Sequence, residues 1–194
     1  MPHARVLKAS SYRRMPWKNG GGETVEIAVS PPDAALSDLD WRVSMATVAA
    51  DGPFSIFAGI DRTLSILEGD GMALVIDGAE PRVLTTASEP LSFPADVAVS
   101  ATLPGGPITD LNVMTRRGRL HHQVERTQID GQSSAHVTSG TWLLLCQHGT
   151  LSLEWASEPV VLDTGDAFLV EGAIDTVVSL TGQALCYLIT IDAA

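Results

Sequence analysis

Histidine and cysteine are scarce in this sequence, and their positions limit the metal sites that it can build. The 194 residues include five histidines and two cysteines, and none of these lies between Ala4 and Leu120. Imidazole and thiolate groups hold Fe, Zn, Cu and Ni in most protein sites. An all-oxygen site for a hard cation stays open, but Arg62 would repel the ion from segment 61–63. We therefore predict no metal and no cofactor.

Basic residues are also few. The chain has 12 Lys and Arg against 23 Asp and Glu, which gives a net charge of -11. Such a charge opposes sequence-independent binding to phosphate backbones and to anionic lipid. The one basic stretch, Arg116–Arg126, is interpreted as a solvated linker. We predict no nucleic-acid partner.

Long apolar runs are missing as well. The first twenty residues contain no apolar segment of the kind that signal peptides carry, and no run approaches the roughly 20 residues that span a bilayer. We predict no membrane association and a cytoplasmic location. Cys146 and Cys186 lie in apolar runs, so they are interpreted as small buried hydrophobic residues instead of a disulfide.

The sequence is rich in short segments that alternate apolar and polar residues. Segments 41–48, 62–67 and 71–76 have a period of two, and clusters of Gly, Pro and Asp separate such segments at short intervals. This pattern is typical of an all-β sandwich or barrel. Segment 31–40 contains two prolines and allows at most one helical turn.

A weak internal repeat has an offset of 78 residues. Segments 80–86 and 158–164 match at five of seven positions, and Gly71 faces Gly149 in the same register. A repeat of this length indicates two copies of one β-module, since the units of a solenoid are shorter. The second copy ends in the apolar run Leu185–Ile191, which also permits a sheet-mediated homodimer.

A glycine-rich stretch, residues 13–24, is the most distinctive local feature. Gly20, Gly21 and Gly22 follow directly after Trp17, Lys18 and Asn19. Three glycines in a row indicate either a turn with positive φ or a close approach of the backbone to another group. A phosphate loop would need its Lys after the glycines, at the start of a helix. Here Lys18 precedes them and a strand-like segment follows, which argues against nucleotide binding.

The order of strands and turns resembles the cupin jelly roll. The turns at 67–71 and 162–168 are similar to those that punctuate that fold. The resemblance implies an RmlC-like, double-stranded β-helix bicupin with two barrels in one chain. We expect residues 1–118 to form the first barrel with additional N-terminal strands. Residues 119–194 would form the second barrel, packed tightly on the first.

Several longer motifs are similar to those of the HutD/Ves family and occur in the same order. They cover most of residues 12–118 and are MPWKNGGG at 15–22, DWRVS at 40–44, DGPFS at 51–55, GIDR at 59–62 and DLNVM at 110–114. Beyond residue 118 the similarity is one of general cupin pattern. The resemblance implies a double-barrel cupin that is associated with histidine utilisation, is treated as regulatory or ligand-binding, and has no established enzymatic activity.

Polar side chains recur on one side of several expected strands. Thr24 shares a side with Glu26, Arg42 with Ser44, and Asp110 with Asn112. Either these sides are solvated and the apolar sides form the core, or they line a pocket inside the barrel. On the pocket interpretation, the ligand-binding candidates are Trp17, Lys18, Asn19, Gly20, Gly21, Gly22, Glu26, Arg42, Ser44, Arg62, Asp110 and Asn112.

Three cations, Lys18, Arg42 and Arg62, lie within the motifs of this acidic chain. They predict a small anionic ligand, a carboxylate of histidine catabolism if the resemblance holds, and thus a role in modulating histidine utilisation. The competing interpretation is that the arginines form internal ion pairs with Asp110, Glu26 or Asp61.

Two further alternatives stay open. One is a metal-independent cupin enzyme, an isomerase or hydrolase acting on a related small acid, although no catalytic group is visible. The other is a second site for a soft metal, formed by Cys146, His148 and Cys186.

Overall fold

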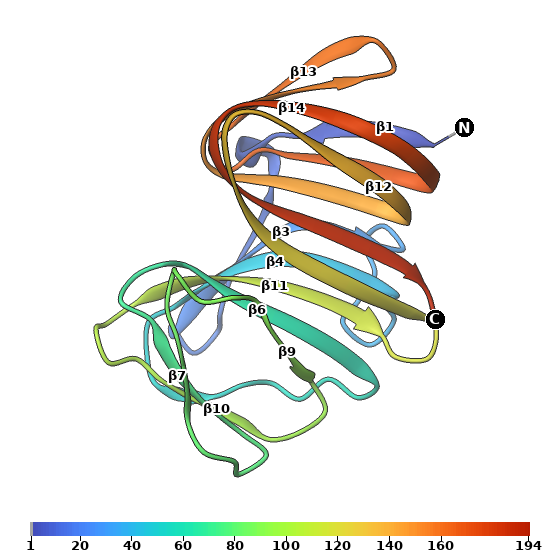
Figure 1. Ribbon diagram of the computed structural model, residues 1–194. Coiled ribbons are helices and arrows are strands. Elements are labelled where there is room, and N and C mark those ends of the chain that lie inside the picture. Colours follow the sequence, from blue (N-terminus) through green and yellow to red (C-terminus); the bar gives the residue numbers. More distant parts are fainter. Residues whose placement is uncertain (1) are drawn as a thin grey trace. The chain divides into compact units, whose positions relative to one another are not determined.

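A computed structural model describes residues 2–194 as an almost purely β protein (Figure 1). It has strands β1 to β14 and one short 3-10 turn, η1 (Ala9–Ser11). No α-helix occurs among the described residues, and none of them forms a helix that is long and apolar enough to cross a membrane. The predicted all-β class is confirmed.

The chain divides into two compact units, each built from its own strands. The central unit comprises residues 13–121 together with Ala194, and the terminal unit comprises residues 2–12 together with 122–193. The first strand therefore belongs with the C-terminal half, although the sequence assigned residues 1–118 to one barrel. The physical reason is strand pairing: β1 (His3–Leu7) runs antiparallel to β14 (Ala167–Ala193), with Leu7 opposite Ala167.

The central unit contains two antiparallel sheets. The larger has the order β2-β3-β4-β11-β6-β9, with bounds Arg13–Pro16, Gly22–Ser30, Trp41–Val48, Ile108–Arg116, Ile60–Glu68 and Leu91–Pro94. The smaller has the order β5-β10-β7-β8, with bounds Gly52–Pro53, Val99–Thr102, Met72–Ile76 and Arg82–Leu84. Side chains from both sheets form one apolar cluster, which includes Leu64, Ile66, Leu74 and Val99.

The terminal unit contains one sheet with the order β1-β14-β12-β13, where β12 is Leu120–Trp155 and β13 is Glu158–Asp163. The long strands β12 and β14 curve strongly in Figure 1. Gly131 and Gly172 have φ values of 86° and 109°, which fit bends within these strands. Trp142 and Phe168 meet edge to face in the core, with ring centroids 6.3 Å apart.

The two halves of the sequence repeat occupy equivalent places in their sheets. Segment 80–86 contains β8 and segment 158–164 contains β13. Each is an edge strand that pairs antiparallel with the strand just before it in the chain. The central unit and the terminal unit thus share a hairpin at the repeated position. That both units are complete cupin barrels stays a prediction.

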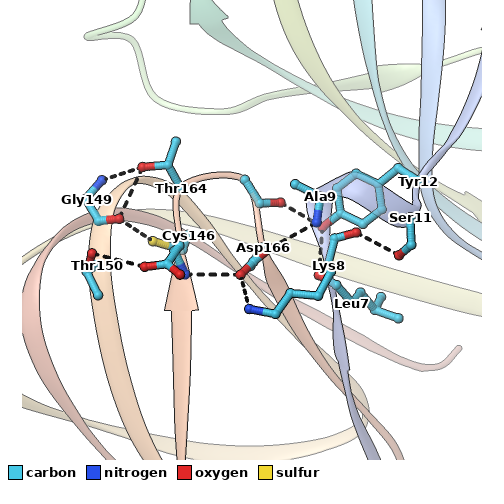
Figure 2. A network of polar contacts seen from close by, with 12 residues as sticks. Leu7, Lys8, Ala9, Ser11, Tyr12, Cys146, Gly149, Thr150, Thr164 and Asp166 are labelled. Carbon is cyan, nitrogen blue, oxygen red and sulfur yellow. Dashed lines mark hydrogen bonds and ion pairs between the residues drawn. The ribbon is translucent and has the colours of Figure 1, made fainter.

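Asp166 ties the N-terminal segment to the rest of the terminal unit (Figure 2). Its carboxylate accepts hydrogen bonds from Lys8 Nζ at 2.6 Å, from the Ala9 N–H at 3.0 Å and from the Asp163 N–H at 3.2 Å. Burial acts to raise the pKa of Asp166, but these bonds outweigh it and hold the pKa below its ordinary value. Tyr12 adds a hydrogen bond from its hydroxyl to the same turn.

We predict that Asp166→Asn destabilises the protein. The amide has only one acceptor oxygen and no charge, so bonds from Lys8 and the backbone are lost, at a cost of about 1–3 kcal/mol in the free energy of unfolding. Urea denaturation at pH 7 measures the loss. Asp175→Asn is the matched control, because the Asp175 side chain is 80% exposed and pairs with the exposed His136. Equal effects of the two substitutions would contradict the structural role of Asp166.

Candidate functional site

The central unit contains a cavity of about 830 Å³. Of the predicted site residues, those that line it are Trp17, Lys18, Asn19, Gly21, Arg42, Ser44, Arg62, Asp110 and Asn112. Gly20, Gly22 and Glu26 are not among the lining residues. The structure therefore gathers most of the predicted residues around one space, although they come from distant parts of the chain.

Strand alternation explains why the polar side chains meet. In the large sheet β11 lies between β4 and β6, and Asn112 is opposite Ser44 on one side and Leu64 on the other. Asp110 is likewise opposite Ala46. Residues opposite one another in a sheet point to the same face. Asn112 and Asp110 therefore share one face of the sheet with Leu64 and Ala46, which belong to the apolar core.

These polar side chains are buried. Arg42, Ser44, Asp110 and Asn112 have exposed fractions of 7%, 3%, 1% and 3%. The interpretation that the polar sides of the strands are solvated is therefore wrong for these four residues. The alternate residues of these strands, such as Val43, are buried as well.

Arg62, Asn112 and Asp110 form a buried chain of hydrogen bonds. Arg62 donates from Nε to Asn112 Oδ1 at 2.7 Å and also from Nη2 to the same oxygen. Asn112 donates from Nδ2 to Asp110 Oδ1 at 2.5 Å. The guanidinium carbon of Arg62 lies 4.6 Å from the centroid of the Phe54 ring, within the range of a cation–π contact.

Burial shifts the pKa values of both charged ends of this chain. Desolvation lowers the pKa of Arg62 to about 10, although the negative charge of Asp110 acts in the opposite direction. Desolvation raises the pKa of Asp110 to about 6, against the charge of Arg62 and hydrogen bonds from Asn112 and from the backbone of Ala46. Among residues 2–194 no group forms a hydrogen bond with Asp110 Oδ2. Asp110 thus lines the cavity and carries one carboxylate oxygen without a hydrogen-bond partner among these residues.

Arg42 forms the internal ion pair that the sequence left open. Its Nε donates to Glu26 Oε2 at 2.8 Å, and the two side chains are 9% and 13% exposed. A bulge in β3 between Glu26 and Ala28 leaves Glu26 opposite Ser44, diagonal to Arg42. Glu26 therefore compensates the charge of Arg42 instead of lining the cavity. Asp61, the other proposed partner, pairs with Arg117.

The three glycines serve the turn and its packing. Gly20 has a φ of 71°, a conformation that glycine adopts without strain. A Cβ on Gly22 would lie 2.0 Å from Thr47 O and 2.9 Å from the Trp17 ring. Close approach to β4 and to the tryptophan thus explains Gly22.

The N–H groups of Gly20 and Gly21, two of the ligand-binding candidates, are bonded within the loop. Gly20 N–H donates to Trp17 O at 3.1 Å, and Gly21 N–H donates to Asn19 Oδ1 at 2.9 Å. These two N–H groups are therefore already bonded and are not free to bind a ligand.

Trp17 and Lys18 border the cavity from the same loop. Trp17 donates from Nε1 to Thr24 Oγ1 at 2.8 Å, which joins β3 to the loop. Lys18 is exposed, and no ion pair to it is found among residues 2–194. It is therefore a cation at the solvent-facing side of the cavity without a compensating carboxylate.

Sequence reasoning missed several lining residues, notably Thr24, Phe54, Phe57 and Met114. The DGPFS motif at 51–55 was a signal for Phe54, and the alternation in β3 was a signal for Thr24. Phe57 lies in a segment without regular secondary structure, where alternation gives no information. The aromatic side chains supply apolar walls next to the polar residues of the sheet.

Residues 2–194 contain no group of three or more His, Cys, Asp or Glu side chains that could hold a metal ion. Cys146 and Cys186 are buried and free, as predicted. The thiol of Cys146 donates to the backbone oxygens of His148 and Gly149, at 3.8 Å and 3.6 Å, and the side chain of His148 is exposed. The alternative of a three-ligand soft-metal site is therefore not supported.

Comparison with protein families gives a match to the model described as HutD over residues 9–188. The chain is 35% identical, over 89% of both chains, to a 21.2 kDa protein in the hutC 3' region of Pseudomonas putida. It is also 40% identical to protein Ves of Citrobacter koseri, over 68% of this chain and 73% of the relative.

Comparison with solved structures also gives a HutD protein among the similar chains. HutD from Pseudomonas fluorescens SBW25 superposes with a TM-score of 0.85 at 34% identity, over 99% of this chain and 100% of the other. Protein Ylba from E. coli superposes with a TM-score of 0.73 at 10% identity, over 98% and 90% of the two chains, and this likeness is one of fold alone. The expected cupin-type fold is confirmed.

We predict that Gly22→Ala destabilises the central unit. The added methyl group would overlap Thr47 O and the Trp17 ring, and overpacking of this kind costs about 1–3 kcal/mol. Urea denaturation measures the change in the free energy of unfolding. Gly52→Ala is the control, because its Cβ would meet nothing within 4 Å and we expect a change below about 0.5 kcal/mol. A neutral Gly22→Ala would refute the packing explanation.

We also predict that Asp110 makes stability fall as pH rises through the acidic range. The folded protein holds the proton of Asp110 more tightly than the unfolded chain, so stability is lost as pH rises from the ordinary pKa toward the raised one. The rise from 3.8 to about 6 corresponds to a loss of about 3 kcal/mol.

Asp110→Asn removes this titration. The free energy of unfolding of the wild-type protein minus that of the variant should therefore decrease between pH 3.5 and 7, as measured by urea denaturation across that range. A pH-independent difference would show that Asp110 titrates normally.

Proposed function

The chain belongs to the HutD family, and from this premise we propose that its central unit binds a small carboxylate of histidine catabolism. The observation that carries the proposal is the exposed cation Lys18, without an ion-pair partner among the described residues, at a cavity whose two arginines are buried. The proposal includes a modulating role in histidine utilisation, which is supported by family membership.

The charges around the cavity favour an anion near Lys18. The two arginines of the large sheet each have a nearby carboxylate: Arg42 is paired with Glu26, and Arg62 is connected through Asn112 to Asp110. Lys18 has no such partner among residues 2–194. In a chain with a net charge of -11, a carboxylate is attracted to this point more strongly than to the surrounding surface.

The size and walls of the cavity also suit a small molecule. A volume of about 830 Å³ lies within the range of about 300–1,000 Å³ for small-molecule sites. Trp17, Phe54 and Phe57 provide apolar surface beside the polar groups of β4, β6 and β11. This combination supports a ligand with an apolar or planar middle and polar ends.

Isothermal titration calorimetry tests the proposal with histidine, urocanate, formiminoglutamate, formylglutamate and glutamate. We expect binding of at least one of them, weakened about two- to fivefold in Lys18→Gln, because an exposed ion pair contributes about 0.2–1 kcal/mol. The effect should shrink at high salt, since exposed charges are screened.

Arg82→Gln is the matched control, because it removes the same charge from an exposed position on β8 of the same unit. Its affinities should equal those of the wild-type protein. If none of the five compounds binds at millimolar concentration, the proposed ligand class is wrong. If Lys18→Gln and Arg82→Gln behave alike, Lys18 is not the point of attachment.

A further inference from the structure

We infer that Asp110 forms a second subsite, deep in the same cavity, that accepts a hydrogen bond from an N–H group of the ligand. The ligand class is then a carboxylate that also carries an N–H donor at its far end, such as a pyrrole-like or imidazole ring or an amide. This inference rests on the proposed function, which supplies the carboxylate end, and deepens it by specifying the other end.

The unsatisfied oxygen of Asp110 carries the inference. The side chain is 1% exposed and lines the cavity, yet Oδ2 has no hydrogen-bond partner among residues 2–194. Leaving a buried acceptor unpaired costs about 1–3 kcal/mol, and more for a charged group. A donor that enters the cavity would recover this free energy.

Two neighbouring side chains donate to atoms other than Asp110 Oδ2, and the Ala46 backbone also acts as a donor to the Asp110 carboxylate and lowers its pKa. Asn112 Nδ2 donates to Asp110 Oδ1, not to Oδ2. Arg62 donates from Nε and Nη2 to Asn112 Oδ1, and no hydrogen bond from Arg62 to Asp110 is found among the described residues. Asn112 thus separates the arginine from the carboxylate. The arrangement orients Asp110 through one oxygen and leaves the other for a ligand.

The charged groups around Asp110 determine its protonation state and therefore which ligand groups it can bind. Arg62 on β6 favours the ionised carboxylate, while Arg42 on β4 is compensated by Glu26 on β3. Lys18 and Asp51 lie on the loops that border the cavity, and Asp51 accepts a hydrogen bond from the Leu103 N–H.

Desolvation raises the pKa of Asp110 only to about 6, so the group is ionised at neutral pH and acts as an acceptor. A second carboxylate on the ligand would be repelled there, whereas an N–H donor would gain a charge-assisted bond.

The two ends of the ligand are therefore expected at different depths. Lys18 is exposed and attracts the carboxylate at the solvent side, while Asp110 is buried and receives the N–H group. Trp17 and Phe54 line the same cavity and offer aromatic surface to a planar spacer.

Two probes that differ in one ring atom test the inference: 3-(2-pyrrolyl)acrylate, which has an N–H donor, and 3-(2-furyl)acrylate, which has oxygen in its place. At pH 7.5 we expect calorimetry to show that the wild-type protein binds the pyrrole probe about tenfold or more tightly than the furan probe. Neither ring titrates between pH 5 and 8. The preference should therefore shrink as pH falls through about 6 and Asp110 takes up a proton.

In Asp110→Asn, the ratio of the affinities for the pyrrole and furan probes should fall to about one or below. The amide carries no charge and can turn its NH₂ group toward the cavity. Asp61→Asn is the matched control: it removes the same charge from the same sheet, at a partly exposed residue that pairs with Arg117, and should keep the wild-type preference. Thermal unfolding of each variant verifies that it is folded, and the pH series on the wild-type protein gives the same test without a substitution.

The outcomes separate the two proposals. Equal affinities for pyrrole and furan in the wild-type protein would overturn the Asp110 subsite and leave carboxylate binding intact, with water alone satisfying Oδ2. A preference that grows below pH 6 would also overturn it, since the protonated acid would then be the active form. Binding of the five carboxylates without binding of either probe rejects the subsite, and no binding of any compound rejects both proposals.

Discussion

The structure of the cavity depends on one constraint: charged groups that are removed from water must be compensated by neighbours in the same sheet. Isolated ions in a protein interior cost many kcal/mol, so buried charges occur with partners. Here β3, β4, β6 and β11 place two arginines and two carboxylates on one buried face. Arg42 meets Glu26 directly, whereas Arg62 and Asp110 are joined through the neutral amide of Asn112.

The direct pair and the indirect chain differ in whether they leave a carboxylate oxygen without a hydrogen bond. A direct ion pair satisfies both partners, so Arg42 and Glu26 hold β3 against β4. The indirect chain satisfies one oxygen of Asp110 and leaves the other open. Such a partly satisfied network costs stability, and groups of this kind are enriched at functional sites. The same sheet thus combines a direct ion pair with the group that we propose as a ligand contact, and the insertion of Asn112 makes the difference.

Much of the fold and part of the site could be predicted from the sequence, because alternation is a local property. Period two alone places Arg42 with Ser44 and Asp110 with Asn112, and turn residues separate the strands. The partner of Arg42 could not be chosen, because it depends on the register of β3 on β4 and on the bulge after Glu26. The placement of β1 beside β14 depends on pairing across about 160 residues, for which no local pattern exists.

In the glycine-rich loop, the backbone and the side chains have different roles. A loop that bound an anion through its backbone would need free N–H groups, yet those of Gly20 and Gly21 close the turn itself. Gly22 is required by the close approach of Thr47 and Trp17. The proposed contact with a carboxylate therefore comes from a side chain of this turn, Lys18, and not from its backbone. Because hydrogen bonds close the turn and Asn112 binds one oxygen of Asp110, both proposed contacts start from groups that the protein already orients.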